Sequence, residues 1–234
     1  KFGSSIHVST LSGFGFDPSI KILVAYFGGP LLLAYYDLSL KTVGLARAAF
    51  GAAFVPIYNN FAAFKSRNIK ANYMYFDKIV SLNCFLVGLC FSVLAILTPL
   101  MSVLFLEKID VTFISITFGM LVAYAGNSLV IPIYTYSQAH KRLFWNNTGQ
   151  VLIACISLFM CVLLGSYDEM LAVYAVPFGL LLGSYVSYLG NRRELLKEYL
   201  VLGEVNLNEV RFLRAMLVVI LSTVITLALS HYFV

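Results

Sequence analysis

The feature that most constrains this chain is a series of apolar stretches, each long enough to cross a bilayer. Windows of about 20 apolar residues, the length that spans a hydrocarbon core, occur at about 4–28, 31–60, 75–106, 111–137, 144–166, 169–190 and 212–233. Hydrophobic residues make up 60% and charged residues 12% of the 234 positions, which is more apolar side chain than a soluble core could bury. We therefore predict an all-α fold, a polytopic membrane helical bundle of about seven transmembrane helices.

The segment 191–210 is too charged to span a bilayer, yet its apolar residues recur at helical spacing. They are Leu195, Leu196, Tyr199 and Leu200. An amphipathic helix of this kind lies in the membrane interface. We therefore predict an interfacial cytoplasmic helix at about 191–210.

Charged residues gather in alternate loops between the apolar stretches. The basic set comprises Lys65, Arg67, Lys70, His140, Lys141, Arg142, Arg192, Arg193, Lys197, Arg211 and Arg214. The other set of loops contains Gly29 and Pro30, then Glu107, Lys108 and Asp110, then Asp168 and Glu169, with Lys108 as its single cation. The positive-inside rule places the basic loops, and with them the start of the chain, in the cytoplasm. Topology therefore explains the net charge of +5, and no patch typical of nucleic-acid binding is present in the sequence.

The first two predicted spans are separated by Gly29 and Pro30, which predicts a tight hairpin of antiparallel helices. Five charged residues lie well inside these two apolar stretches: Asp17, Lys21, Asp37, Lys41 and Arg47. A charge at that depth costs several kcal/mol unless it is paired or hydrated. The hairpin is therefore the part of the chain where we expect function to concentrate.

Four of these charges form two pairs with helical spacing. Asp17 with Lys21, and Asp37 with Lys41, are each four residues apart and so share a helix face. Lys21 and Asp37 are about equally far from the turn, as are Asp17 and Lys41, so the pairs could cross-link. We predict a four-residue network of alternating sign that faces the protein interior or a water-filled cavity. Whether it merely joins two helices or serves transport stays open at this point.

Arg47 lies nearer the predicted cytoplasmic side, with no acidic residue one helical turn away. A guanidinium is suited to bidentate contact with phosphate, so we predict that Arg47 binds an anion. Asn59 and Asn60, near the cytoplasmic end of the same helix, could line a polar cavity for sugars or lie at the membrane interface.

Sequence motifs give no support for catalysis. No nucleophile with a base, carboxylate pair, metal-spaced His or Cys cluster, or phosphate-binding glycine loop is present. We therefore expect no enzyme activity, no metal site and no cofactor. A purely structural membrane subunit is also disfavoured, because five charges inside apolar spans would be costly.

The hairpin sequence resembles a known family. The segment FGSSIHVSTLSGFGFDPSIKILVAYFGG, followed by LLLAYYDLSLKTVGLARAAFGAAFVPIY, is similar to the seventh and eighth helices of polysaccharide (O-antigen type) flippases. That family belongs with the multidrug and toxin extrusion transporters and the lipid II flippases. Its pattern of Asp, Gly turn, a Y-x-L-A-x-K-like stretch and Pro corresponds here to Asp17, Gly28, Gly29, Tyr36, Leu38, Lys41 and Pro56. The segment GNSLVIPIYTYSQAHKRLFWNNTGQVLI resembles the tenth and eleventh helices.

This resemblance implies a fold of two helical lobes around a central cavity. Residues 1–234 would be the C-terminal transmembrane lobe, and an N-terminal lobe of the same protein, absent from this chain, would be its partner. The implied function is alternating-access translocation of an undecaprenyl-pyrophosphate-linked oligosaccharide across the bacterial inner membrane, often coupled to a proton or sodium gradient. A seventh span departs from the usual six-helix second half of the family.

The resemblance also implies roles for individual residues of the hairpin. By position, Arg47, Lys41 and Lys21 would bind pyrophosphate and Asn59 the sugar. Asp17 and Asp37 would orient the cations or take part in ion coupling. Membrane lipids and the lipid-linked oligosaccharide would be the partners.

Two alternatives remain open on the sequence. The first is a cation-coupled multidrug or metabolite exporter of the same fold, in which the acidic residues would matter more than the basic ones. The second is a membrane glycosyltransferase or polymerase. Such an enzyme needs catalytic groups on a sizeable extracytoplasmic loop, whereas these loops are only a few residues long.

Overall fold

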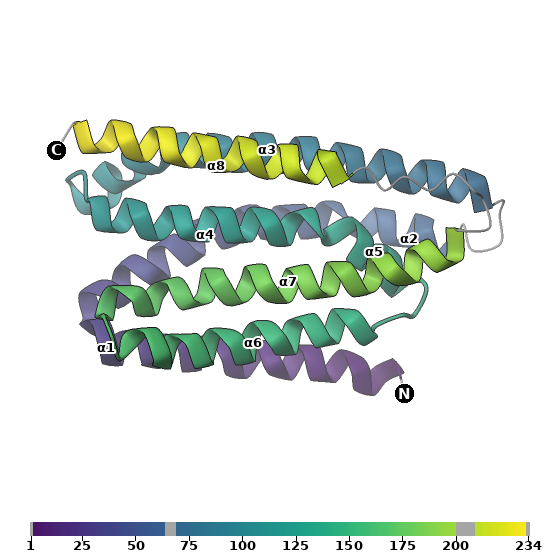
Figure 1. The fold of residues 1–234 in the computed structure, drawn as a ribbon, viewed down its shortest axis with the longest axis horizontal. Coiled ribbons are helices and arrows are strands. Elements are labelled where there is room, and N and C mark those ends of the chain that lie inside the picture. The colour runs from purple at the N-terminus through teal and green to yellow at the C-terminus, as the bar shows by residue number, and fades with distance from the viewer. Residues whose placement is uncertain (1, 64–68, 200–208, 233–234) are drawn as a thin grey trace.

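The chain forms an all-α bundle of long helices that run roughly along one common axis (Figure 1). The computed structural model describes the backbone of residues 2–63, 69–199 and 209–232 and the side chains of residues 16–62, 72–197 and 210–230. The helices in these ranges are α1 (Phe2–Ala53), α2 (Val55–Ala63), α3 (Ile69–Leu106), α4 (Val111–Leu129), α5 (Ile131–Ala139), α6 (Phe144–Gly165), α7 (Glu169–Tyr199) and α8 (Glu209–Tyr232). The predicted fold class is therefore confirmed.

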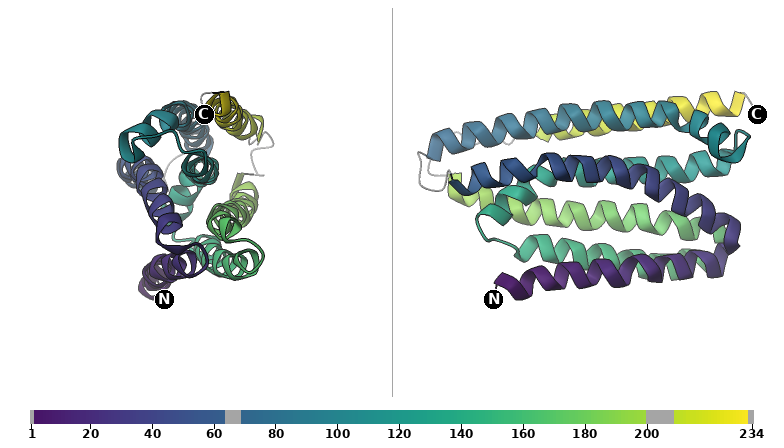
Figure 2. Two further views of the ribbon diagram at one scale, coloured as in Figure 1. Left: turned by 90° about the vertical axis from the view of Figure 1, so that its left-hand side faces the viewer. Right: turned by 180° about the vertical axis from the view of Figure 1, so that it is seen from behind.

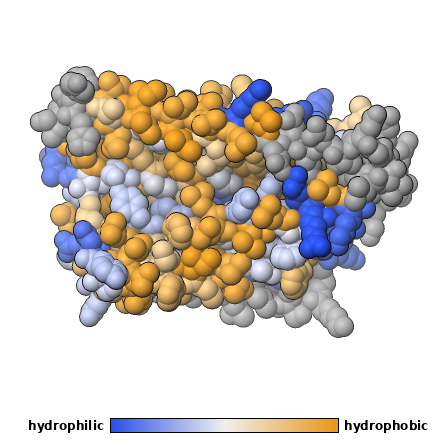
Figure 3. All heavy atoms as spheres, viewed as in Figure 1, coloured by the Kyte–Doolittle hydropathy of each residue, from blue (hydrophilic) through white to orange (hydrophobic). Residues whose placement is uncertain are grey.

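Among the described residues, six segments are long and apolar enough to cross a membrane. They are Phe16–Ala62, Asn72–Leu106, Val111–Ala139, Phe144–Gly165, Glu169–Lys197 and Val210–Ser230. Apolar side chains cover most of the face shown in Figure 3, and the strongly hydrophilic ones gather toward the two ends of the bundle. Such a surface suits lipid rather than water. The chain is accordingly a multi-pass membrane protein.

The first of these segments is bent into a hairpin at Gly29. This residue has φ 70° and ψ −176°, a conformation that is essentially restricted to glycine. The two arms, residues 2–28 and 30–53, run in opposite directions and splay apart away from the turn (Figures 1 and 2). The predicted hairpin is therefore present, and α1 passes along the bundle twice.

Two further helix breaks fall two residues before a proline. α1 gives way to α2 at Phe54, before Pro56, and α4 gives way to α5 at Val130, before Pro132. Because proline has no N–H, Pro132 leaves the carbonyl of Ser128 without its helical donor. The buried side chain of Asn83 on α3 replaces that donor, with its amide nitrogen 3.1 Å from the Ser128 oxygen. The break is thus stabilised by a neighbouring helix.

The first part of the predicted interfacial helix at 191–210 is continuous with the preceding span. α7 continues without interruption to Tyr199, and Asn191 and Leu195 are both 2% exposed. Asn191 donates to Asn146 on α6, with 2.6 Å between its amide nitrogen and the Asn146 side-chain oxygen. Asn191 is therefore accommodated by a contact inside the bundle, whereas Arg193 and Lys197 are exposed, and the placement of this end of α7 at the membrane interface stays a prediction. Residues 200–208 lie outside the described part of the chain.

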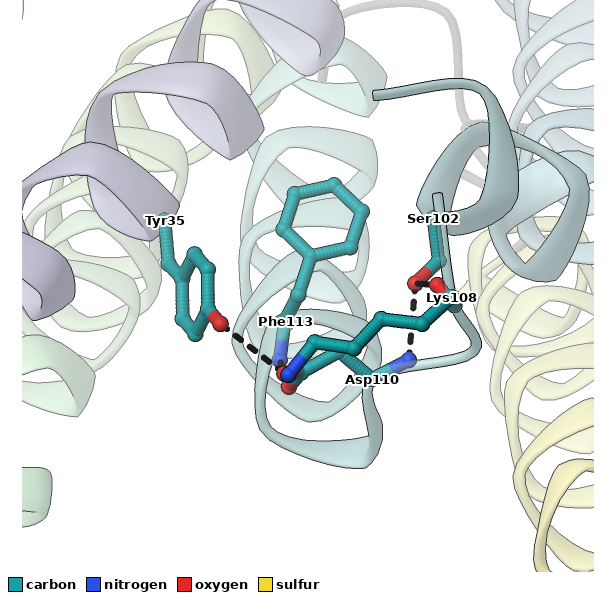
Figure 4. A network of polar contacts seen from close by, with 5 residues as sticks. All are labelled: Tyr35, Ser102, Lys108, Asp110 and Phe113. Atoms are coloured by element: carbon teal, nitrogen blue, oxygen red, sulfur yellow. Dashed lines mark hydrogen bonds and ion pairs between the residues drawn. The ribbon is translucent and has the colours of Figure 1, made fainter. Parts of the chain in front are cut away.

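A polar clasp ties the hairpin to the α3–α4 turn (Figure 4). The Asp110 carboxylate caps α4 by accepting from the Phe113 amide at 3.1 Å, and it also accepts from the Tyr35 hydroxyl at 2.8 Å. The Lys108 ammonium lies 3.1 Å from the same carboxylate, and the Asp110 amide donates to the Ser102 hydroxyl. This clasp fixes the second arm of α1 to the beginning of α4.

The clasp predicts a pH-dependent contribution to stability. Burial opposes the charged form of Asp110, but the bonds from Phe113, Tyr35 and Lys108 outweigh it and hold the pKa of this carboxyl below its usual 3.8. Asp110→Ala should lower the free energy of unfolding by about 1–3 kcal/mol. The difference between wild type and variant should be constant above pH 3.8 and shrink as the pH falls below it, because the unfolded chain then binds the proton first.

Thermal unfolding in detergent micelles across this pH range measures the effect. Asp168→Ala is the matched control, since the Asp168 carboxylate accepts from the Met170 amide at the beginning of α7 in an exposed, local contact. We expect it to lower stability by about 1 kcal/mol at most. Equal losses in the two variants would mean that the contacts of Asp110 to Tyr35 and Lys108 contribute nothing.

Candidate functional site

The charges of the α1 hairpin form one chain of ion pairs. Lys21 lies 3.3 Å from Asp17 on its own arm and 2.8 Å from Asp37 on the opposite arm. Lys41 lies 2.7 Å from Asp37. The predicted network of alternating sign therefore exists, but its two arms are joined by the Lys21–Asp37 pair alone among the ion pairs that the described residues form. The arms diverge beyond that pair, which is why Asp17 and Lys41 do not meet.

This network is partly exposed and lies deep in the apolar sequence. The side chains of Lys21 and Asp37 are 34% and 28% exposed, whereas those of Asp17 and Lys41 are 51% and 70% exposed. Lys21 is eight residues from Gly29, or about 12 Å along the helix, which is close to half the thickness of a hydrocarbon core. Charges at this depth need water or polar protein beside them. The open side of the hairpin is therefore unsuited to contact with lipid tails.

Arg47, ten residues beyond Asp37 and six beyond Lys41 on the second arm, lies in a different environment. Its guanidinium Nε donates to the side-chain oxygen of Asn127 on α4. The Asn127 amide nitrogen in turn donates to the Ser184 hydroxyl on α7 at 2.7 Å. Arg47 takes part in none of the ion pairs recorded among residues 16–62, 72–197 and 210–230. Its partner is a neutral amide, so its positive charge is held in place without being cancelled by a carboxylate.

Two neighbouring cavities meet at Arg47. The larger has a volume of about 430 Å³ and lies where both broken helices bend, with Phe54, Tyr58, Tyr134 and Gln138 among its lining residues. Both helix breaks lie at this space, since Phe54 and Ile131 are among its lining residues. Aromatic faces and side-chain amides around a guanidinium are suited to a ligand that carries both an anionic group and polar rings.

The smaller cavity continues inward between α4, α6 and α7. It has a volume of about 120 Å³, and its polar lining consists of Arg47, Asn127, Tyr134, Gln150, Ser184 and Ser187. On α7 the polar residues recur at Ser184, Ser187 and Asn191, a spacing that places them on one helix face. This polar stripe leads from Arg47 toward the end of α7 that carries basic residues.

The predicted site residues are thus divided between two places. Arg47 lines both cavities, whereas Lys21 and Lys41 lie in the ion-pair network with Asp17 and Asp37. The side chain of Asn59 is exposed and is not among the residues that line either cavity around Arg47. Asn60, also exposed, donates to the Tyr75 hydroxyl at 3.2 Å.

Several polar residues of the site escaped the sequence analysis. Asn127, Gln150 and Ser184 are polar residues inside predicted spans. An amide inside a transmembrane segment is costly unless it is hydrogen-bonded, and this signal could have identified Asn127. Which of its neighbours it would contact could not be read from the sequence, since Arg47 and Asn127 are 80 positions apart.

The arrangement can hold an anion by a charge-assisted hydrogen bond in a low-dielectric setting, with neutral donors beside it. Its polar side chains come from five helices, α1, α4, α5, α6 and α7, so a movement of these helices would change the site. Comparisons with protein-family models, with curated proteins and with solved structures find no match to this chain.

Proposed function

We propose that this chain is one lobe of a membrane flippase that translocates an anionic, sugar-bearing lipid. The substrate class that fits best is an undecaprenyl-pyrophosphate-linked oligosaccharide, moved across the bacterial inner membrane by alternating access in polysaccharide or O-antigen biosynthesis. The observation that carries this proposal is the Arg47 guanidinium, which lines two cavities inside the bundle and bonds to a neutral amide. A pyrophosphate would supply the missing negative charge.

The cavities support a head group larger than a phosphate. Tyr58 and Tyr134 offer aromatic faces for sugar rings, and Gln138 offers both a donor and an acceptor for hydroxyl groups. In the proposed orientation the basic loops are cytoplasmic, so the larger cavity would face the cytoplasm. That is the side on which a lipid-linked sugar would be loaded.

The ion-pair network of the hairpin would take part in the same transport cycle, at the cavity between the two proposed lobes. Lys21 and Lys41 would add positive potential for the passing pyrophosphate, and Asp17 and Asp37 would orient them or take up a proton or a sodium ion. The exposed positions of Asp17 and Lys41 support an arrangement in which a second lobe covers this face and leaves water between. An N-terminal lobe of the same protein is the proposed partner.

Short turns disfavour the alternative of a membrane glycosyltransferase or polymerase. The α3–α4 turn comprises residues 107–110 and the α6–α7 turn residues 166–168. Asp110 in the first turn is already engaged by Tyr35 and the Phe113 amide. Turns of this length offer no room for a catalytic site, and we propose that the protein is not an enzyme.

The alternative of a cation-coupled exporter is favoured by one observation. Asp37 lies between two ammonium groups, at 2.8 Å from Lys21 and 2.7 Å from Lys41. Protonation of Asp37 would break both of its ion pairs, leaving Lys21 with Asp17 alone, and such a change could couple protons to transport of a neutral or cationic substrate. In that case Asp37 would matter more than Arg47.

Substitution of Arg47 separates the two functions. In cells that depend on the native protein for surface polysaccharide, Arg47→Ala should reduce export about 100-fold, since a charge-assisted contact of about 3 kcal/mol is lost. Arg47→Lys should retain part of the activity because it keeps the charge but not the bidentate geometry. Export is measured by labelling surface polysaccharide, with protein abundance in the membrane measured in parallel.

The matched control is Arg193→Ala, which removes an exposed arginine of α7 outside both cavities. We expect it to leave export unchanged. Normal export with Arg47→Ala would refute the flippase proposal. For the cation-coupled alternative the readout is efflux of a cationic dye, which Asp37→Asn should abolish and Arg47→Ala should leave normal.

A further inference from the structure

A groove on the outside of the bundle, between α3 and α8, combines an apolar floor with a basic end. Its volume is about 380 Å³, and its apolar lining includes Phe85, Gly88, Ala215 and Val218. At Gly88 an added Cβ would lie 3.7 Å from the Ala215 backbone, so α3 and α8 pack closely there. Gly88 is itself buried against α8 and contributes backbone to the groove. The groove is separate from both cavities around Arg47.

The basic end of the groove carries more positive charge than the helix contact requires. Arg211 bonds to Asp77, with 3.0 and 3.1 Å from its Nη1 to the two carboxylate oxygens, and this pair fastens α8 to α3. Arg214, one turn further on α8, is exposed, lines the same groove, and joins none of the ion pairs among the side chains that the structure describes. Lys78 is exposed next to Asp77, one turn before Ser81 of the groove. Asp77 balances one of these three cations.

The position of these cations matches the level of lipid head groups. From Arg214 to Tyr232 at the end of α8 the helix extends about 27 Å, close to the thickness of a hydrocarbon core. Arg214 therefore lies where that core gives way to head groups, with the apolar part of the groove extending into the membrane. In Figure 3 hydrophilic side chains lie over the beginning of α8, on a surface that is otherwise apolar along this helix.

We propose that this groove binds one anionic phospholipid from the leaflet at the side where α8 begins. Its phosphate lies against Arg214 and Arg211, with Lys78 adjacent, and one acyl chain follows Phe85 and Val218 along the groove. Charge complementarity selects the occupant, because a zwitterionic lipid would leave the excess positive charge unbalanced. The proposal does not depend on what the protein transports, since it involves neither Arg47 nor the hairpin.

Native mass spectrometry of the purified chain tests this, with phosphatidylglycerol and phosphatidylcholine of identical acyl chains offered in equal amounts. We expect selective retention of phosphatidylglycerol. Arg214→Gln should reduce that retention about fivefold, the effect of one charge near a membrane surface. Val218→Trp should reduce retention of both lipids by filling the groove. Arg193→Gln, which removes an exposed arginine elsewhere, should leave retention unchanged.

Three results would overturn the proposal. Equal retention of the two lipids would show that charge does not select the occupant. An equal loss in Arg214→Gln and Arg193→Gln would reduce the effect to general attraction of a basic protein for acidic lipid. Displacement of phosphatidylglycerol by soluble glycerol phosphate at the same concentration would show a phosphate site that does not recognise the acyl chain.

Discussion

Gly183→Ala is expected to separate α6 from α7 and to destabilise the bundle by about 1–3 kcal/mol, although it adds a single methyl group. A Cβ at this position would lie 2.4 Å from Ile153 Cγ1, 2.8 Å from the Gly149 carbonyl oxygen and 2.8 Å from the Ile153 amide nitrogen. A side chain can change rotamer, but backbone atoms of a neighbouring helix can move only if the helix moves. The two helices must therefore part.

The contact is reciprocal, which is why we expect a large effect. A Cβ at Gly149 on α6 would lie 2.6 Å from Ser187 Cβ and 3.0 Å from the Gly183 oxygen. One turn away, a Cβ at Gly179 would lie 2.8 Å from the Ser157 backbone nitrogen. Small residues four apart allow membrane helices to approach closely, and lipid offers no hydrophobic force that would hold separated helices together. The pair α6 and α7 therefore depends on the absence of these side chains.

Thermal unfolding in detergent measures the effect, and Gly44→Ala is the matched control. An added Cβ at Gly44 would find nothing within 4 Å, and alanine favours a helix over glycine, so that variant should be at least as stable as the wild type. Gly183 also lines the smaller cavity beside Arg47. Gly183→Ala should therefore reduce export as well. Equal melting temperatures for the two variants would contradict this account of the packing.

Much of the fold could be predicted because the bilayer imposes simple rules. Apolar length predicts helices that cross the membrane, and Gly29 with Pro30 predicts a turn that only glycine can make at φ 70°. The cross-arm pair of Lys21 and Asp37 was also predictable, since two residues equally distant from a turn meet across a hairpin.

The interior of the site could not be predicted in the same way. The contacts of Arg47 with Asn127 and of Asn83 with the Ser128 carbonyl join helices that are distant in sequence, and their geometry depends on how the helices pack. The contact of Asn191 with Asn146 likewise joins α7 to α6 across 45 positions. The sequence does not show which helices pack together, so these partners could not be predicted.

Asp37→Leu is expected to destabilise the hairpin by about 2–3 kcal/mol, somewhat less than the loss of one partner from a fully buried pair. Asp37 holds the two arms together through Lys21 and also neutralises Lys41. Without Asp37, Lys41 lies at the depth of the apolar core with no carboxylate beside it. Lys21 then pairs with Asp17 alone, at 3.3 Å. The partial exposure of these side chains reduces the cost, because water can reach them.

The alternating signs of the four network residues also predict the effects of combined substitutions. Lys21→Leu with Asp37→Leu also removes the partner of Asp17 and leaves Asp17 and Lys41 unpaired on separate arms, so the double variant should be no more stable than Asp37→Leu alone. Exchange of the two charges, Lys21→Asp with Asp37→Lys, should not restore stability, because each new charge would lie one turn from a like charge, Asp17 or Lys41. Membrane-inserted yield and thermal unfolding measure these effects. Wild-type stability of the exchanged variant would show that Lys21 and Asp37 act as an isolated pair rather than as the centre of a four-residue network.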